Sequence, residues 1–290
     1  MKALAQIIEA AAVRLFLALF AMLPLDRASA VGGWLARMIG PRLAVSRVAR
    51  RNLGHAFPDK SAAEIEAIVV GMWDNLGRVA AEYPHLGKID VTDPEGRVEV
   101  VGVEHVERLR DDDMCGIFVS AHLGNWEIAS LGAIQNGVPL TQIYRAANNP
   151  YIEPLLRRLR APVGGANFPK GAAGAKQLIK ALRRGDHLGM MIDQKLNEGI
   201  AVPFFGRHAM TAPAPAQLAL KFGCPIVPAR VERLEGAHFR LTVYPPLNLA
   251  VSGDRQADLA AAMGRINALI EDWIRARPEQ WLWLHRRWPD

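Results

Sequence analysis

A histidine and a glutamate follow an apolar segment at a spacing that suits acid–base chemistry. Residues 116–121 form a short, nearly continuous apolar run, which is typical of a strand buried on both faces. His122 follows the run, Gly124 breaks it, and apolar residues at helical spacing begin at Trp126. Glu127 therefore falls in a first helical turn, from which its carboxylate is expected to reach one imidazole nitrogen of His122. The other nitrogen of a ring held in this way is free to act as a general base.

The same two residues also have a structural interpretation. The helix dipole alone favours acidic residues in first helical turns, and a lone histidine is often structural. The sequence has no G-x-S-x-G nucleophile elbow and no glycine-rich phosphate loop. Ser120 is too close to His122 along the chain to serve as the nucleophile of a triad. A catalytic His122 is therefore expected to activate a hydroxyl group of a substrate.

Polar residues follow three of the expected strands, at the point where each strand ends. They are His122, Arg145 and the pair Asp193-Gln194. Since ligands of open α/β sheets bind beyond the carboxyl ends of parallel strands, these residues are expected to share one edge. Arg145 suits a developing oxyanion or a phosphate. Asp193 suits a partner for Arg145 or for a substrate hydroxyl, and Gln194 is expected to be a further substrate contact. The structural alternatives are a solvated loop arginine and a turn aspartate.

The elements that must position these residues alternate along the chain from residue 98. Short apolar runs predict strands at 98–101, 116–121, 140–144, 188–192, 226–231 and 239–243. Helical patterns lie at 61–83, with Ser61 and Glu64 as a capping box, and at 126–136, 150–160, 172–184, 213–222 and 256–277. The alternation predicts an α/β fold with a largely parallel central sheet and flanking helices, in which the last two strands form an antiparallel edge.

The first 60 residues differ in composition from the rest and are expected to form a separate, helical membrane-association region before an α/β domain at 61–290. They hold nine Lys or Arg against three Asp or Glu, so the whole net charge of +6 lies there. Residues 10–25 are apolar apart from Arg14 and end near Pro24, which predicts a helix embedded in, or marginally spanning, a bilayer. A core helix and a signal peptide are the alternatives. Basic residues among apolar ones favour an anionic membrane or an acidic partner over nucleic acid, for which no recognition module is present.

Composition limits the remaining possibilities. Half of the residues are hydrophobic and 22% are charged, which is too polar for a protein with many membrane spans. Cys115 and Cys224 lie beside strand-like runs without a metal-binding spacing, so we expect reduced, buried thiols in a domain facing the cytosol, with a chance pairing of the two as the alternative. No H-E-x-x-H motif or other metal spacing occurs, and nothing predicts a metal or an organic cofactor.

Several motifs in order resemble one enzyme family. The chain is similar to the lipid A biosynthesis lauroyl and myristoyl acyltransferases, and the similarity extends over essentially its whole length. The residues that carry it are His-x4-Glu at 122–127, Ile143-Tyr144-Arg145, Asn149-Pro150, Asp193-Gln194, Pro203-Phe204-Phe205-Gly206, Thr211 and the tryptophan-rich end at 278–288. His-x4-Glu/Asp alone is shared with glycerol-phosphate and other lysolipid acyltransferases, so the ordered set is what distinguishes the family.

The resemblance implies a function and a place in the cell. It implies transfer of a fatty acyl group from an acyl carrier protein thioester to a hydroxyl of a lipid A precursor. His122 would be the general base and Glu127 its partner, with Arg145, Asp193 and Gln194 as further site residues. Neither a cofactor nor a metal is needed. The implied location is the bacterial inner membrane, with an N-terminal anchor and the catalytic domain facing the cytoplasm.

Two other functions fit some of the same residues. An acyltransferase of similar chemistry acting on a lysophospholipid, an ornithine lipid or a glycolipid would need the same base. A non-catalytic peripheral lipid-binding protein would account for the basic apolar N-terminus and for the apolar Phe204-Phe205 and tryptophan-rich segments. Those aromatic segments suit either contact with an acyl chain or packing inside the domain.

Overall fold

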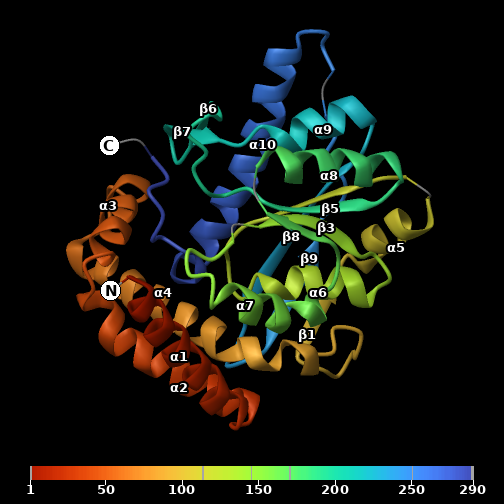
Figure 1. Cartoon of the computed structure of the whole chain (residues 1–290). Helices are drawn as coiled ribbons and strands as arrows, with labels where there is room; N and C mark the ends of the chain where they lie inside the picture. The colour runs from red at the N-terminus through yellow and green to blue at the C-terminus, as the bar shows by residue number, and fades with distance from the viewer. Residues whose placement is uncertain (1, 113, 145, 170, 250, 289–290) are drawn as a thin grey trace.

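The computed structural model describes residues 2–112, 114–144, 146–169, 171–249 and 251–288 (Figure 1). Seven strands form one sheet in the order β1-β9-β8-β2-β5-β3-β4, and two further strands, β6 and β7, form a hairpin. The seven are β1 (Val98–Val101), β2 (Ile117–Ser120), β3 (Leu140–Tyr144), β4 (Asn167–Pro169), β5 (His187–Met191), β8 (Ile226–Arg233) and β9 (Phe239–Val243). The hairpin comprises β6 (Ile200–Phe204) and β7 (Arg207–Thr211).

The sheet is mostly parallel, which confirms the predicted fold class. Every neighbouring pair in it is parallel except β8 and β9. These two strands are antiparallel as predicted, but they do not form the edge of the sheet, because β1 pairs with the outer side of β9. The prediction missed β4 and the hairpin, which are short or lie between turn residues.

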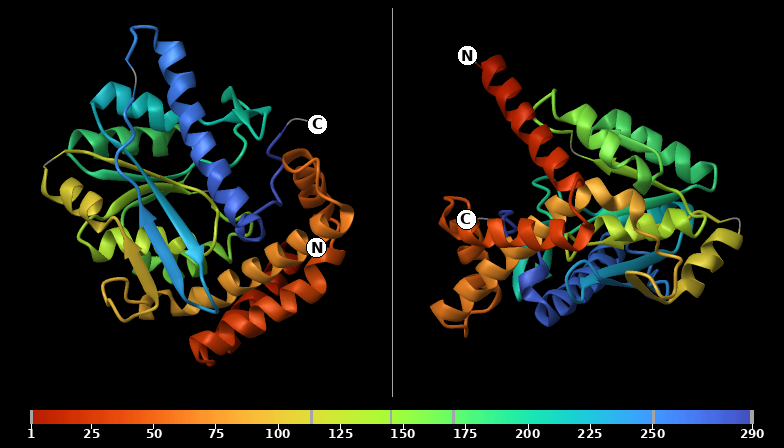
Figure 2. Two further views of the ribbon diagram at one scale, coloured as in Figure 1. Left: turned by 180° about the vertical axis from the view of Figure 1, so that it is seen from behind. Right: turned by 90° about the horizontal axis from the view of Figure 1, so that it is seen from below.

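Helices cover both faces of the sheet (Figures 1 and 2). On one face lie α5 (Val103–Asp111), α6 (Glu127–Gln135) and α7 (Glu153–Leu159), and on the other α8 (Ala172–Arg183), α9 (Ala214–Phe222) and α10 (Arg255–Ala276). Side chains alternate along β2, so that Phe118 packs in the core on the α6 side while Ile117 and Val119 pack on the α8 side. The 3-10 turns η3 (Ala161–Val163) and η4 (Pro278–Gln280) lead away from α7 and α10.

Four helices precede the sheet and lie together along its side (Figure 1). They are α1 (Lys2–Ala21), α2 (Leu25–Ile39), α3 (Ser46–Ala56) and α4 (Ala62–Glu82), with η1 (Gly40–Arg42) after α2 and η2 (Tyr83–Lys88) after α4. The predicted capping box of Ser61 and Glu64 begins α4. Gly32 of α2 lies against Gly77 of α4 so closely that a Cβ on either would collide with the backbone of the other. Helix α1 diverges from the body toward its N-terminal end (Figure 2, right), and the boundary proposed at residue 60 stays a prediction.

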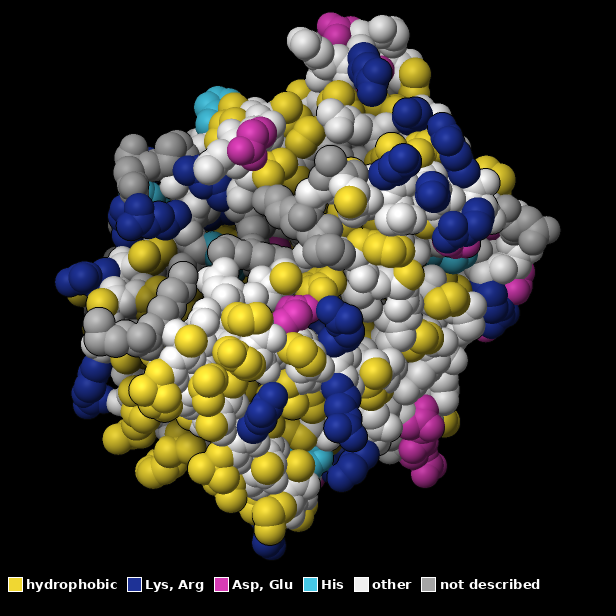
Figure 3. Space-filling model, in the orientation of Figure 1, with side chains coloured by type: hydrophobic (Ala, Val, Ile, Leu, Met, Phe, Trp, Pro, Cys, Tyr) yellow, Lys and Arg dark blue, Asp and Glu magenta, His cyan; other side chains and the backbone are white. Residues whose placement is uncertain are grey.

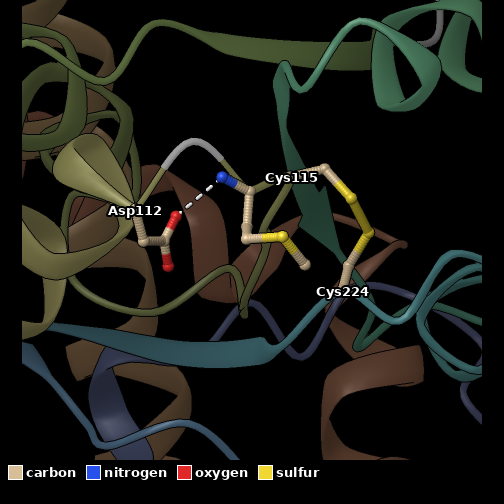
Figure 4. Close-up of a disulfide and its surroundings, with 4 residues drawn as sticks. Asp112, Cys115 and Cys224 are labelled. Carbon is tan, nitrogen blue, oxygen red and sulfur yellow. Dashed lines mark hydrogen bonds between the residues drawn. A yellow bond between two sulfur atoms is a disulfide. The ribbon is translucent and has the colours of Figure 1, made fainter.

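The two cysteines form a disulfide, so the expectation of free thiols is wrong (Figure 4). Cys115 precedes β2 and Cys224 precedes β8, and their Cα atoms are 5.5 Å apart. The strands are paired with Ile117 opposite Ile226. Each cysteine lies two residues before one of these isoleucines, so the two cysteines face each other. The pairing depends on a register between strands more than 100 residues apart, which the spacing of the cysteines in the sequence does not reveal.

Candidate active site

His122 and Asp193 meet at the carboxyl edge of the sheet, as predicted for residues that follow parallel strands. β2 and β5 are paired with Ser120 opposite Met191, so the residues two positions later lie side by side. His122 Nδ1 is 2.8 Å from Asp193 Oδ1. Asp193 Oδ2 accepts two further hydrogen bonds, from the His122 backbone N–H at 2.8 Å and from Trp281 Nε1 at 2.7 Å. The carboxylate thus holds the imidazole ring and its backbone together.

The charges of this pair support each other in a buried environment. Burial on its own lowers the pKa of His122, but the charge of Asp193 and its hydrogen bond outweigh burial, so the pKa lies above its usual value. Burial acts to raise the pKa of Asp193, and the interactions with His122 and Trp281 reverse this, so that the pKa is lowered. Asp193 is therefore an anion at neutral pH, and it favours the tautomer in which His122 Nδ1 carries the hydrogen.

Glu127 lies next to this pair but has other hydrogen-bond partners. Its Oε1 accepts from the Tyr83 hydroxyl at 2.5 Å and from Arg160 Nε and Nη2 at 3.1 and 2.6 Å. The expected contact with the ring of His122 is thus replaced, because Asp193 already occupies Nδ1 and the arginine draws the glutamate toward α7. The negative charge of Glu127 still contributes to the raised pKa of His122. Burial together with the Glu127 charge raises the pKa of Tyr83, which keeps its hydroxyl protonated as a donor.

The second imidazole nitrogen of His122 faces Gln194 and His285. Gln194 Nε2 is 3.4 Å from His122 Nε2 and 2.7 Å from His285 Nε2. The two imidazole rings are 6.0 Å apart, and Trp126 contacts His122 edge-on at 5.2 Å between ring centroids. Among the described residues, Gln194 is the one hydrogen-bond partner of His122 Nε2, and this contact is long. This atom is therefore placed to exchange a proton with a substrate.

A buried polar network holds the turn between His122 and Glu127. Asn125 Nδ2 donates to Glu82 Oε2 at 2.9 Å, and Arg233 pairs with the same glutamate at 2.5 Å. Asn75 Nδ2 donates to the Gly124 carbonyl at 3.0 Å. Gly124 has a φ of 58°, and a Cβ there would lie 2.8 Å from a backbone oxygen, so a glycine is needed.

The two N–H groups at the centre of this turn already donate hydrogen bonds to backbone carbonyls. The Gly124 N–H donates to the Gln280 carbonyl at 3.1 Å, and the Leu123 N–H donates to the Ala121 carbonyl at 2.7 Å. Both N–H groups are therefore occupied within the protein. Arg145 itself lies outside the described residues.

The aromatic segments noted in the sequence pack inside the domain. Phe204, Phe205, Trp281, Trp283 and Trp288 are buried and contact one another, with ring centroids 4.5 to 6.3 Å apart. This cluster fixes the C-terminal segment that delivers Trp281 to Asp193 and His285 to Gln194. Among the described residues, no three His, Cys, Asp or Glu side chains are grouped so as to hold a metal ion.

The structure brings together four of the residues that the sequence proposes for the site, and their roles stay a prediction. His122, Glu127, Asp193 and Gln194 gather at one edge of the sheet. Tyr83 and Arg160, which contact Glu127, and the Trp281 indole, which contacts Asp193, were not predicted as partners, since each comes from a segment distant in sequence. The tryptophan-rich end was the one signal in the sequence for these partners. Its motif is specific, but which residues its tryptophans contact depends on the fold.

A histidine oriented by a buried carboxylate at the carboxyl edge of a parallel sheet is typical of α/β enzymes that transfer a proton during catalysis. Comparison with known proteins narrows this class. Residues 3–290 match the profile of the bacterial lipid A biosynthesis acyltransferases, so the chain belongs to this family. It is therefore an acyltransferase, which excludes the non-catalytic lipid-binding alternative.

Individual relatives agree with this assignment. A lipid A biosynthesis acyltransferase of Haemophilus influenzae is 25% identical over 275 residues, which cover 93% of this chain and 84% of the relative. The lipid A biosynthesis lauroyltransferase of Escherichia coli K12 is 28% identical over 252 residues, 83% of this chain and 78% of the relative. A phosphatidylinositol mannoside acyltransferase of Mycolicibacterium smegmatis is 26% identical over 246 residues, 82% of this chain and 78% of the relative.

Proposed function

We propose that the protein transfers a fatty acyl group from an acyl carrier protein thioester to a hydroxyl of a lipid A precursor, with His122 as the general base. The observation that carries the proposal is the 2.8 Å contact between His122 Nδ1 and Asp193, which leaves Nε2 directed at the substrate side. An acyl carrier protein is strongly acidic, so the basic N-terminal segment, with its net charge of +6, favours its docking.

In the proposed mechanism, His122 Nε2 takes the proton of the acceptor hydroxyl as its oxygen attacks the thioester carbonyl carbon. The imidazolium that forms is stabilised by Asp193 through a hydrogen bond and by Glu127 through its charge. When the tetrahedral intermediate collapses, the C–S bond breaks and the imidazolium returns the proton to the leaving thiolate. The products are an ester of the acceptor and the free thiol of the carrier.

Two residues are candidates for contact with the substrate oxygens. The Gln194 amide group lies between His122 and His285 and carries N–H donors that suit a developing oxyanion. Arg145 directly follows β3 in the sequence, and its cation suits the same charge. We keep both as proposed substrate-binding residues.

The base assignment is tested with the His122→Ala variant in an assay with defined acyl carrier protein thioesters and a tetra-acylated lipid A precursor. We expect loss of nearly all transfer without loss of folding. The matched control is His238→Ala, since His238 is exposed in the turn between β8 and β9 and its ring contacts the backbone of Glu235. Turnover near the wild-type rate in His122→Ala would refute the mechanism.

A second acceptor is favoured by one relative. One relative, at 26% identity, is named a phosphatidylinositol mannoside acyltransferase, which supports a different glycolipid as the alternative acceptor. The two possibilities are separated by mass spectrometry of membrane lipids from a strain that lacks the gene. Loss of one acyl chain from lipid A supports the first, and unchanged lipid A with an altered second lipid class supports the alternative.

We further propose that the protein is anchored on the bacterial inner membrane with the catalytic domain facing the cytoplasm. Ala3–Ala21 is a helix long and apolar enough to cross a bilayer. Exposed apolar side chains gather over α1 and α2, with lysine and arginine side chains beside them (Figure 3). Deletion of residues 1–25 is expected to release the protein into the soluble fraction without detergent. Continued membrane association of the deletion variant would place the anchor elsewhere.

A further inference from the structure

A cavity of about 610 Å³ lies between α1, η2 and the α7–η3 segment. Its volume falls in the range of about 300–1,000 Å³ that is typical of sites for small molecules. Apolar groups of α1 and α7, among them Leu17, Ala18 and Leu155, form its walls. One wall thus belongs to the helix proposed as the membrane anchor, so the cavity borders the region where lipid would lie.

The charged residues that line the cavity all have the same sign. They are Arg14, Lys88 and Arg158, and no carboxylate is among the described residues of the lining. Arg14 donates to the Tyr151 carbonyl at 3.5 Å, while no ion pair is formed by Lys88 or Arg158 within the described part of the chain. Three cations around an apolar space are complementary to a lipid that carries a phosphate.

Arg14 is notable because of where it lies. It is the single charged residue in the apolar stretch 10–25, where a cation is costly if the helix enters a membrane. Such residues are retained when a partner compensates their charge, and the cavity places Arg14 beside an unfilled, cation-lined space. An anionic ligand there would reduce the cost.

The cavity is connected to the candidate active site through one side chain. Tyr83 lines the cavity, and its hydroxyl donates to Glu127 at 2.5 Å and accepts from Arg160 at 3.1 Å. Arg160 belongs to the same segment as Arg158, which lies on the cavity wall. Tyr83 therefore links the cavity to Glu127, whose charge acts on His122.

We propose that this cavity binds the acceptor lipid, with an acyl chain along the α1 wall and a phosphate held by Arg14, Lys88 and Arg158. This inference rests on the proposed function, since it assigns a place to the acceptor of that reaction. The acceptor enters from the bilayer beside α1, and its sugar hydroxyl extends past Tyr83 and Glu127 toward His122 Nε2. Because the acyl carrier protein comes from water, the donor does not need this route.

The charge contacts are tested by comparing a phosphorylated tetra-acylated lipid A precursor with the same lipid after removal of its phosphates. For the full-length wild-type enzyme in detergent, we expect KM for the acceptor to rise about tenfold or more without the phosphates, the usual size of a lost charge-assisted contact. The Lys88→Glu, Arg158→Glu double variant should show the higher KM with both lipids and unchanged KM for the donor. Arg157→Glu is the control, since Arg157 is 73% exposed on the same helix and does not line the cavity.

The outcomes decide between a phosphate site and other roles. If the double variant still discriminates between the two lipids as the wild type does, the phosphate does not lie at these cations and the proposal fails. If phosphatidylglycerol added to the micelles at equal mole fraction displaces the precursor, the cavity binds bulk phospholipid and the acceptor assignment is overturned.

A second measurement separates this inference from the proposed function. Ala18 is exposed on α1 and lines the cavity, so Ala18→Trp fills it without disturbing the core. Ala12→Trp, on another face of α1, is the control. Direct binding of the phosphorylated precursor is followed by native mass spectrometry, which needs no turnover. Loss of binding in Ala18→Trp alone supports the cavity even if the wild type fails to acylate the lipid, and equal binding by all three proteins refutes it.

Discussion

Replacement of Asp193 with asparagine tests how the proposed base is held in its active tautomer. Asp193 Oδ2 accepts two N–H groups, from the His122 backbone and the Trp281 indole, while Oδ1 faces His122 Nδ1. In Asp193→Asn, the amide oxygen is expected to keep the two donors. The amide N–H then points at His122 Nδ1, which must become an acceptor. The hydrogen of the neutral ring moves to Nε2, and the atom that should accept the substrate proton is blocked.

The size of the effect follows from the alternative orientation of the amide. If the amide oxygen turned to His122 Nδ1, the NH2 group would face the two N–H donors and leave both unpaired in a buried site. Each unpaired donor costs about 1–3 kcal/mol, so the inactive arrangement is favoured by about 2–6 kcal/mol. At about 1.4 kcal/mol for a factor of ten, kcat should fall by about 30-fold to 10⁴-fold.

The assay is the initial rate of acyl transfer at saturating donor and acceptor, together with the melting temperature from circular dichroism. Asp258→Asn is the control, because Asp258 is also buried and accepts hydrogen bonds from Ser252, but it lies in the first turn of α10, outside the site. The control should keep kcat near the wild-type value. A folded Asp193→Asn variant with kcat within about threefold of the wild type would show that Asp193 does not orient the base.

Two further predictions concern pH and the disulfide. Because the pKa of His122 is raised and the base must be neutral, kcat should fall as pH decreases, with a midpoint above the usual pKa of about 6.5. Glu127→Gln should move the midpoint of this pH profile of kcat to lower pH. An unchanged midpoint in Glu127→Gln would mean that the charge of Glu127 does not act on the ring. The Cys115→Ser, Cys224→Ser variant loses a covalent link across 109 residues, so its free energy of unfolding in urea titrations should fall by about 2–5 kcal/mol. Its kcat at low temperature should be unchanged. Equal stability of the oxidised wild type and the variant would contradict this prediction.

The sequence predicts the edge of the sheet at which the site forms because local patterns determine where strands end. His122 and Asp193 follow apolar runs, and parallel pairing alone brings such residues to one edge. The partner of the imidazole depends instead on register. Ser120 lies opposite Met191, which brings Asp193 beside His122, and no local pattern encodes this pairing. The disulfide escaped prediction for the same reason.

Glu127 illustrates the opposite limit of sequence reasoning. Its distance from His122 along the chain is short, and the glutamate is indeed buried beside the ring, but Tyr83 and Arg160 compete for its carboxylate. Tyr83 begins η2 and also lines the cavity beside α1, and Arg160 directly follows α7. The two carboxylates are thus suited to different tasks. Asp193 orients the ring by direct contact, whereas Glu127 acts on it through space while linking it to the helices that border the proposed lipid site. A change in that lipid site should therefore alter the pH profile as well as KM, and a change at Asp193 should alter mainly kcat.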